Sequence, residues 1–178
     1  LAPRVAVNVS VRQLLSPGFE HVVATALEDS GLPGDRLEVE VTESVFDPRH
    51  TAVTLDSLLR LRALGVRIHV DDFGAGYSSL SRLHEFPIDV IKVDRSFTGN
   101  LDGAGRAIFE GAIVIARRFG LGVVAEGVET EAQARELCAL GVDALQGYWL
   151  GAPDLAPRTR AVAPTWLPDA RLGARPQA

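Results

Sequence analysis

The sequence predicts an α/β fold, a TIM-type (β/α) barrel that is incomplete and lacks roughly the first two β-α units. Apolar strand-like runs alternate regularly with amphipathic helix-like segments. This order indicates parallel strands joined by right-handed crossovers. A barrel of this type has eight strands in ~250 residues. The chain has 178 residues and six strand candidates, so about two units are missing, and we expect them to precede this segment.

The first three predicted strands are rich in β-branched residues and end in polar ones. They are "VAVNVS" (5–10), "LEVEVTES" (37–44) and "VRIHVDDF" (66–73), followed by amphipathic segments at 21–31, 54–65 and 79–87. The helix candidates at 21–31 and 54–65 close on "SG" and "LG", where glycine suits the left-handed residue that ends a helix.

The last three predicted strands repeat the pattern. They are "DVIKVD" (89–94), "LGVVAEGVET" (121–130) and "VDALQGYWL" (142–150), separated by helix candidates at 105–120 and 131–141. These helices close on "FG" and "LG". The complete alternation is therefore a series of β-α units.

Polar residues alternating with apolar ones favour a barrel over a doubly wound sheet. In a doubly wound sheet the strands are apolar on both faces, because helices cover both. Here Glu38 and Glu40 alternate with Val39, and Lys92 lies between Ile91 and Val93. One face packs on helices and the other carries polar groups, as in the upper interior of a functional barrel.

The chain divides into two parts. Residues 1–155 form the C-terminal part of the barrel, and residues 156–178 are a Pro/Arg/Ala-rich tail that is weakly ordered or packed outside it. The chain starts at Leu1 and contains no methionine, so we expect it to be part of a longer product.

Composition predicts a globular domain and argues against some partners. Hydrophobic residues make up 47% and charged residues 23%, and the formal net charge is -5, which argues against binding to polymeric nucleic acid. Cys138 is the single cysteine, so no disulfide forms within the chain. Its spacing in the helical pattern is that of a packed thiol. No apolar run approaches the ~20 residues that span a bilayer. We expect a reducing, cytoplasmic setting, whether or not the complete protein is tethered to a membrane.

Polar residues occur at or near the end of every predicted strand. They are Asn8, Glu40, Asp71 with Asp72, Lys92, Glu126 and Gln146. Carboxyl ends of barrel strands converge on one cavity, and oxygen ligands suit hard cations such as Mg²⁺ or Mn²⁺. Two adjacent aspartates are tolerable beside positive charge, and one carboxylate can bridge two ions ~3.5–4 Å apart.

Each of these residues also has a purely structural interpretation. A lone asparagine in a strand is usually a satisfied polar group, and "DD" before glycine is often a turn with capping carboxylates. The coincidence across six strands favours function. Glu38 and His69 lie one step deeper, so we interpret them as a buried hydrogen-bond or ion pair. Lys92 could be a counter-ion for the carboxylates or could orient a water and a phosphate.

Six ordered motifs resemble one known family. "VNVS", "EVTES", "DDFGAGYSSL", "IKVDRSF", "VVAEGVET" and "ALQGYWLGAP" closely resemble the EAL-domain phosphodiesterases, which hydrolyse the bacterial second messenger cyclic di-GMP. The resemblance covers nearly all of residues 4–153. It implies a metal-dependent phosphodiesterase that uses two divalent cations, Mg²⁺ or Mn²⁺, and produces linear pGpG.

The resemblance also implies individual roles. Asn8, Glu40 and Asp71 would bind one ion, Asp71 would bridge, and Asp72 with Glu126 would hold the other. Lys92 would position the attacking water, and Asp71, Lys92 and Glu126 would be the catalytic group. Gln146 would support the site, while Glu43 and Glu129 would steady the loop 73–79, which in the family couples dimerisation to catalysis. The implied partners are cyclic di-GMP, a second copy in a homodimer, and sensory or cyclase domains upstream.

The Glu-Ala-Leu tripeptide that names the family occurs nowhere in the chain. We attribute this to the missing β-α units, and expect the segment alone to be weakly active or inactive. Two alternatives remain open at this stage. One is a non-catalytic EAL-like module that senses cyclic di-GMP or contacts a protein partner, and the other is a different divalent-metal barrel hydrolase.

Overall fold

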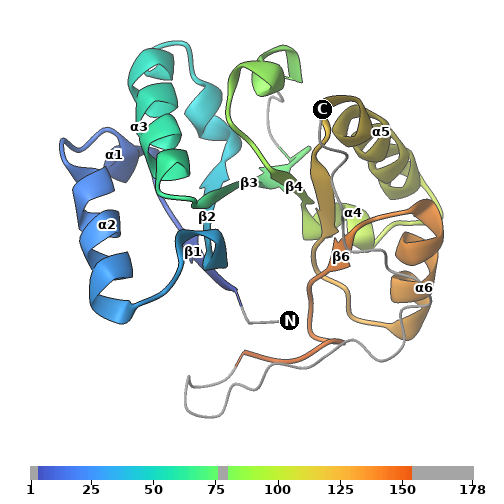
Figure 1. Cartoon of the computed structure of the whole chain (residues 1–178). Helices are drawn as coiled ribbons and strands as arrows, with labels where there is room; N and C mark the ends of the chain where they lie inside the picture. The colour runs from blue at the N-terminus through green and yellow to red at the C-terminus, as the bar shows by residue number, and fades with distance from the viewer. Residues whose placement is uncertain (1–3, 76–79, 154–178) are drawn as a thin grey trace.

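The computed structural model describes residues 4–75 and 80–153 and contains one parallel sheet. Its strands are β1 (Val5–Asn8), β2 (Leu37–Thr42), β3 (Arg67–Phe73), β4 (Val90–Val93), β5 (Gly122–Ala125) and β6 (Ala144–Leu145). They lie in the order β1-β2-β3-β4-β5-β6. The sheet curves, with helices along its outer side (Figure 1).

The strictly sequential strand order decides between the two α/β architectures. A doubly wound sheet reverses its strand order at a switch point, and no reversal occurs among these six strands. The predicted barrel class is confirmed. Within the described residues the sheet is an open arc whose edges are β1 and β6, which agrees with an incomplete barrel.

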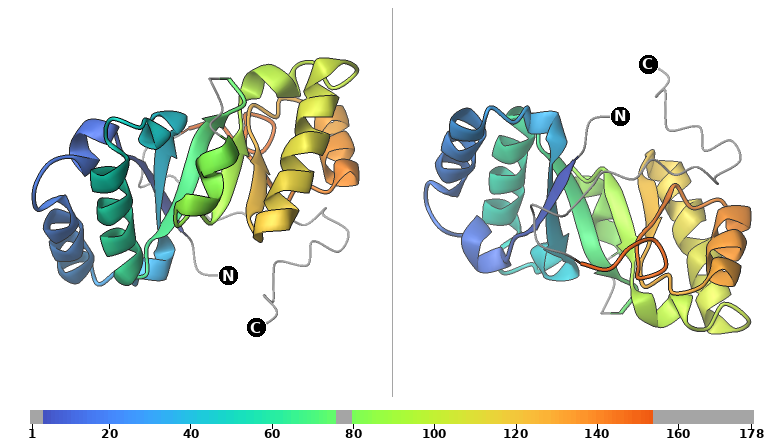
Figure 2. Two further views of the ribbon diagram at one scale, coloured as in Figure 1. Left: turned by 90° about the horizontal axis from the view of Figure 1, so that it is seen from above. Right: turned by 90° about the horizontal axis from the view of Figure 1, so that it is seen from below.

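Helices connect the strands on the outer side of the arc. They are α1 (Val11–Leu14), α2 (Phe19–Ser30), α3 (Thr51–Ala63), α4 (Arg95–Thr98), α5 (Ala104–Phe119) and α6 (Glu131–Leu140), with 3₁₀ turns η1 (Gly34–Arg36), η2 (Glu43–Phe46) and η3 (Leu80–Glu85). Figure 2 shows the blue helices α1 and α2 and the teal helix α3 on one flank, and the yellow helix α5 and the orange helix α6 on the other.

The helices end and begin at the kinds of capping residue that the sequence predicts. Gly31 and Gly120 adopt left-handed φ values of 66° and 69° directly after α2 and α5, as expected from "SG" and "FG". Thr130 caps α6 through a reciprocal pair of hydrogen bonds with Gln133.

Three predicted elements differ from those observed. The amphipathic segment at 79–87 contains the 3₁₀ turn η3, because Pro87 leaves it too short for a stable α-helix. The predicted strands at 121–130 and 142–150 are pairing regions of only four and two residues, and irregular chain follows both. The predicted tail at 156–178 lies outside the described residues.

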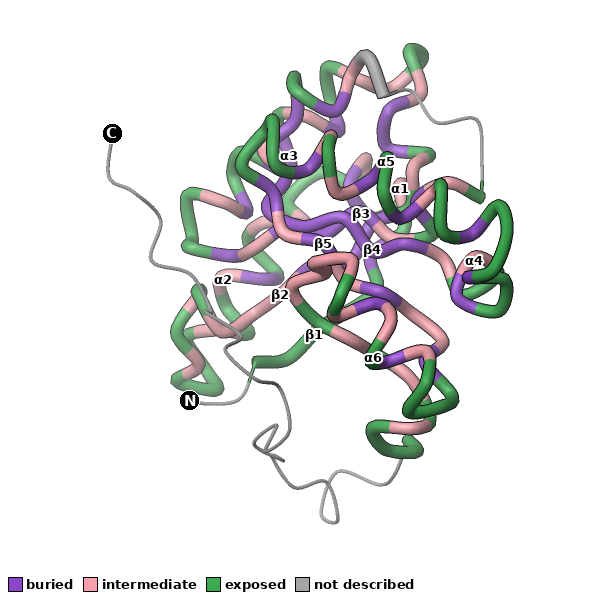
Figure 3. Tube along the Cα trace, turned by 90° about the vertical axis from the view of Figure 1, so that its right-hand side faces the viewer, coloured by how far each residue is buried: buried purple, intermediate pink, exposed green. Residues whose placement is uncertain are grey.

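The core lies between the sheet and the outer helices. Ile68, Val70, Ile91 and Val93 point outward and are completely covered, and they belong to the same cluster as Phe109 of α5. Buried residues concentrate on β3, β4 and β5, whereas β1 is exposed along its length (Figure 3). The central strands therefore form the most rigid part of the sheet.

Two carboxylates fix the strands at the amino-end rim of the sheet. Asp89 accepts a hydrogen bond from the Ile68 amide at 3.0 Å, and Arg62 lies 3.4 Å from the same carboxylate. Asp143 repeats this arrangement with the Val123 amide at 2.8 Å and Arg117 at 3.1 Å. At this rim each carboxylate therefore has an arginine and a backbone donor.

Among residues 4–75 and 80–153, none of the helices has the length and apolar character needed to cross a bilayer.

We predict that Ile91→Ala lowers the free energy of unfolding by about 2–5 kcal/mol, because it leaves a cavity under fully buried neighbours. The control is Val114→Ala on α5, whose side chain is 70% exposed and whose loss should change stability by less than about 0.5 kcal/mol. Urea denaturation followed by circular dichroism measures both. Equal effects would show that the outer face of β4 is not the core.

Candidate functional site

The polar side chains predicted from the strand ends gather at the carboxyl-end rim of the sheet. Glu40 lies on β2, Asp71 and Asp72 end β3, and Lys92 lies on β4, while Glu126 directly follows β5. Strand register turns Glu40, Asp71 and Lys92 to the inner face, because the residues between them pack outward under the helices.

Lys92 is the centre of this group. Its ammonium lies 2.9 Å from the Glu40 carboxylate, 3.1 Å from that of Asp71 and 2.7 Å from that of Glu126. The Lys92 side chain is only 3% exposed. One buried cation thus connects three different strands or strand ends and uses all three of its N–H donors.

The charge state of Lys92 follows from these contacts. Burial alone would lower its pKa, but the hydrogen bonds and charges of Glu126 and Glu40 outweigh burial and raise the pKa above its ordinary value. Lys92 therefore carries its proton at neutral pH. Burial raises the pKa of Glu126, and the hydrogen bond from Lys92 opposes this shift.

A bulge in β3 explains how two adjacent aspartates can serve one site. Successive residues of a regular strand point to opposite faces, but the register from Val70 to Phe73 spans three steps on β3 against two on β4. Asp72 takes up the extra residue with a left-handed φ of 55°, and its amide donates to the Asp71 carboxylate at 3.1 Å. The bulge brings the second carboxylate to the same rim.

The donor set suits a divalent cation. Asp71, Asp72 and Glu126 each offer an oxygen, and these oxygens lie within 4.8 Å of one another. Counting Glu40, four carboxylates lie at this rim, and three of them, Glu40, Asp71 and Glu126, pair with the ammonium of Lys92. Partial desolvation and the charge of Asp71 raise the pKa of Asp72, which is the direction expected where negative charge lacks a counter-ion. Oxygen ligands of this kind match Mg²⁺ or Mn²⁺.

The remaining proposed metal ligands lie toward the open edge. Asn8 is the register partner of Glu40 and shares its inner face, but it is exposed on β1. The compact group of carboxylates, Asp71, Asp72 and Glu126, does not include Glu40. The structure thus brings Asp71, Asp72, Glu126, Glu40 and Lys92 together and leaves Asn8 beside them.

Glu43 anchors the backbone after the two aspartates. Its carboxylate accepts a hydrogen bond from the Gly74 amide at 3.0 Å, which ties η2 to the end of β3. The predicted loop 73–79 is described only as far as residue 75, so its remaining contacts, including any with Glu129, lie outside the described residues.

Glu38 and His69 form a deeper layer, and Arg67 and Arg4 join them. The Glu38 carboxylate lies 3.3 Å from Arg67, 3.6 Å from Arg4 and 3.7 Å from His69. Burial lowers the pKa of His69 to about 4, and the positive charge of Arg67 adds to this. His69 is therefore neutral at neutral pH, so the charge partners of Glu38 are the arginines.

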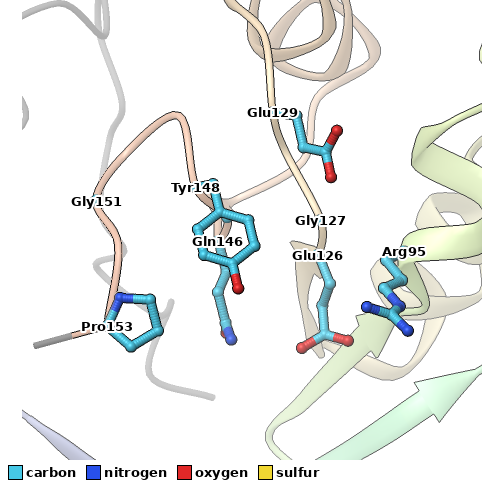
Figure 4. A pocket seen from close by; sticks show the side chains of 9 residues that line it. Arg95, Glu126, Gly127, Glu129, Gln146, Tyr148, Gly151 and Pro153 are labelled. Carbon is cyan, nitrogen blue, oxygen red and sulfur yellow. The ribbon is translucent and has the colours of Figure 1, made fainter.

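A pocket of about 260 Å³ adjoins the carboxylates at Glu126 (Figure 4). Gln146, which follows β6, and Glu129 line it, as do Arg95 of α4 and Tyr148. Sequence reasoning missed Arg95 and Tyr148, although both lie in strand-end motifs, "IKVDRSF" and "ALQGYWL". The signal was their position only a few residues beyond Lys92 and Gln146.

Comparison with known proteins identifies related chains. The family model described as "EAL domain" matches residues 2–153. A bifunctional diguanylate cyclase/cyclic di-GMP phosphodiesterase, MucR of Pseudomonas aeruginosa, is 42% identical over 151 residues, which are 84% of this chain and 22% of MucR. The chain spans about a fifth of the length of the first curated relatives that it matches.

Solved structures agree with the sequence comparison. A c-di-GMP complex of the phosphodiesterase PaMucR superposes with a TM-score of 0.81 at 40% identity, over 86% of this chain and 69% of that one. A manganese/c-di-GMP complex of Klebsiella pneumoniae BlrP1 gives a TM-score of 0.75 at 34% identity, over 82% of this chain and 37% of that one.

We predict that Lys92→Met destabilises the protein by about 3–5 kcal/mol when no divalent cation is added, because three carboxylates lose their shared buried partner. Added Mn²⁺ should restore much of this loss by binding the freed carboxylates. Urea denaturation with and without Mn²⁺ measures both effects.

The matched control for this variant is Arg60→Met. Arg60 forms ion pairs with Asp56 and Glu20, but its side chain is 57% exposed. Its loss should cost no more than about 1 kcal/mol and should not respond to Mn²⁺. A Lys92→Met protein as stable as the wild type would contradict the central role given to this ammonium.

Proposed function

The chain belongs to the EAL domain family, and we propose that the complete protein is a metal-dependent phosphodiesterase that hydrolyses cyclic di-GMP to linear pGpG. The observation that carries this proposal is the convergence of Asp71, Asp72 and Glu126 beside a buried, protonated Lys92. The names of MucR, PaMucR and the BlrP1 complex support the choice of substrate.

The carboxylate oxygens provide places for two divalent cations, Mg²⁺ or Mn²⁺. Asn8, Glu40 and Asp71 would hold one, Asp72 and Glu126 the other, and Asp71 would contribute to both. Bound cations of this class lower the pKa of a water and stabilise the departing oxygen of a phosphodiester. The excess of carboxylates over ammonium groups at the rim is the physical reason to expect them.

The protein's own side chains orient the reaction. Lys92 is protonated at neutral pH, so it acts as a hydrogen-bond donor and a positive charge, not as a base. In this role it would hold the attacking water and a phosphate oxygen in line. Glu43 keeps the backbone after Asp72 in place through the Gly74 amide, and Gln146 supports the Glu126 side of the site.

The wider context of the segment is also part of the proposal. MucR is named as bifunctional, and the matched region is 22% of its length. This supports the expectation of sensory or cyclase domains upstream in the complete protein. The homodimer and the cytoplasmic setting stay predictions. A sensor without catalysis is less well supported, because every metal position that the segment covers retains an oxygen ligand.

The function is tested by incubating the complete protein with cyclic di-GMP and Mg²⁺ or Mn²⁺ and separating the products by chromatography. The proposal requires pGpG to appear only when a divalent cation is present. Binding without cleavage would indicate the sensor, and cleavage of other phosphodiesters in preference would indicate a different barrel hydrolase.

Asp71→Asn in the complete protein is expected to abolish turnover, with kcat falling by more than about 100-fold. Changing a residue that merely supports a metal ligand already costs about 10–100-fold, and Asp71 is proposed to serve both ions. The control is Asp56→Asn on α3, whose carboxylate is exposed and, among the residues that the structure describes, pairs only with Arg60. Retained metal-dependent hydrolysis in Asp71→Asn would contradict the assignment.

Purified residues 1–178 are expected to show weak or no hydrolysis of cyclic di-GMP. The sheet is open at β1 and β6, and the Glu-Ala-Leu motif that supplies a further ligand in the family is absent from the sequence. The same chromatographic assay, at equal concentrations of segment and complete protein, measures the difference. Turnover by the segment at the rate of the complete protein would disprove this prediction.

A further inference from the structure

Glu126 is held by its backbone as well as by its carboxylate. Its amide donates a hydrogen bond to the Val93 carbonyl at 3.2 Å, and its carbonyl accepts one from the Thr98 hydroxyl at 2.5 Å. The carboxylate itself lies 2.7 Å from the Lys92 ammonium. All three partners belong to residues 92–98, so the turn from β4 into α4 fixes Glu126 at three points.

Thr98 is a buried polar residue at the end of α4, and its side chain is the only one of these partners that reaches the Glu126 backbone. It is 1% exposed, so water cannot replace its hydroxyl as the donor to the Glu126 carbonyl. Valine has nearly the same shape as threonine but no donor, and it would leave this carbonyl unpaired or make it move toward water. Either outcome displaces the backbone from which the Glu126 side chain projects.

The end of α4 is also tied to the start of α6. The side-chain amide of Gln133 donates a hydrogen bond to the Thr98 carbonyl at 3.3 Å, while the side-chain oxygen of Gln133 accepts from the amides of residues 129 and 130 at 2.9 and 3.0 Å. The segment 126–130 is thus bonded at one end to Thr98 and at the other end to a glutamine that also holds Thr98. This closed arrangement limits how far the segment can move relative to α4.

We propose that Thr98 is a positioning residue whose hydroxyl sets the place of Glu126 in the cation site, with Gln133 supporting it from α6. The carboxylate oxygens of Asp71, Asp72 and Glu126 lie within 4.8 Å of one another, so a small displacement of one of them changes how the group binds an ion. This inference rests on the proposed function, because it takes these carboxylates as ligands of a divalent cation.

The test measures the dissociation constant of Mn²⁺ from the complete protein by calorimetry without substrate, and then the Mn²⁺ concentration that gives half-maximal hydrolysis of cyclic di-GMP. Thr98→Val should raise both quantities about 10- to 100-fold, the usual effect of losing a residue that orients a metal ligand. Thr98→Ser keeps the hydroxyl and should stay close to the wild type. KM for cyclic di-GMP at saturating Mn²⁺ should not change, because the variant removes no group proposed to contact the substrate.

Gln133→Glu tests the support from α6, and it decides the question if Thr98→Val does not fold. A glutamate keeps the oxygen that accepts from the amides of residues 129 and 130, so α6 keeps its cap. It lacks the donor to the Thr98 carbonyl. We expect it to weaken Mn²⁺ binding by less than Thr98→Val does. Mn²⁺ affinity equal to that of the wild type in Gln133→Glu, with Thr98→Val equal or unfolded, would overturn the proposal.

The matched control is Thr51→Val on α3, whose half-buried hydroxyl donates to the Asp47 carbonyl at 2.9 Å. This bond lies in the turn before α3 and involves no residue of the rim, so its loss should leave Mn²⁺ affinity unchanged. Lower stability of Thr98→Val with unchanged Mn²⁺ affinity would mean a purely structural role. A Thr98→Ser protein that binds Mn²⁺ as weakly as Thr98→Val would mean that the hydroxyl is not responsible. Both results overturn the proposal.

Failure of the proposed function has a different signature. If the wild type binds Mn²⁺ but never cleaves cyclic di-GMP, the hydrolase proposal fails. Mn²⁺ binding by the variants then still decides the role of Thr98, because calorimetry without substrate does not depend on turnover.

Discussion

The ion group around Lys92 is the interaction on which the rest of the site depends. Three carboxylates from β2, β3 and the segment after β5 lie within 3.1 Å of one ammonium that is almost completely buried. Buried charges cost several kcal/mol each unless their partners are well placed. The strand ends must therefore keep their relative positions. The sequential order and the fully buried outer faces of β3 and β4 make this possible, because they leave the inner face as the only place for polar side chains.

The carboxylates at the two rims of the sheet differ in how completely their charge is compensated. At the amino ends, Asp89 and Asp143 each have an arginine and a backbone amide as partners, so their charge is locally compensated. At the carboxyl ends, Glu40, Asp71 and Glu126 share Lys92 and Asp72 lies beside them, so negative charge remains in excess. The first arrangement stabilises the fold without an external ligand. The arrangement at the carboxyl ends is less favourable without added positive charge, and such an excess of negative charge favours strong binding of a cation.

The barrel class and most of the carboxylates of the site could be predicted from the sequence, because the carboxyl ends of parallel strands meet at one rim whatever their spacing in the chain. Glu40, Asp71 and Glu126 were found in this way. The orientation of Asp72 could not be, since it depends on a bulge and a positive φ that alternation does not reveal. The deeper layer was only half predicted. Glu38 and His69 are neighbours, but neutral His69 leaves the charge of Glu38 to Arg67 and Arg4.

Arg95 and Tyr148 escaped prediction for a different reason. The place of Arg95 depends on how closely α4 approaches the chain after β5 at Gly127, and the place of Tyr148 depends on how closely the chain after β6 approaches Val128 at Gly147. Each glycine permits its approach through its missing side chain. A sequence pattern identifies Gly127 as a turn residue but not the element packed on it. The glycines of the strand-end motifs therefore act on the site in two ways. They turn the chain, and they let a neighbouring element bring its own side chain to the rim. The chemistry of the rim is set by carboxylates on the strands, whereas the shape of the adjoining pocket is set by how tightly the segments beyond the strands pack together.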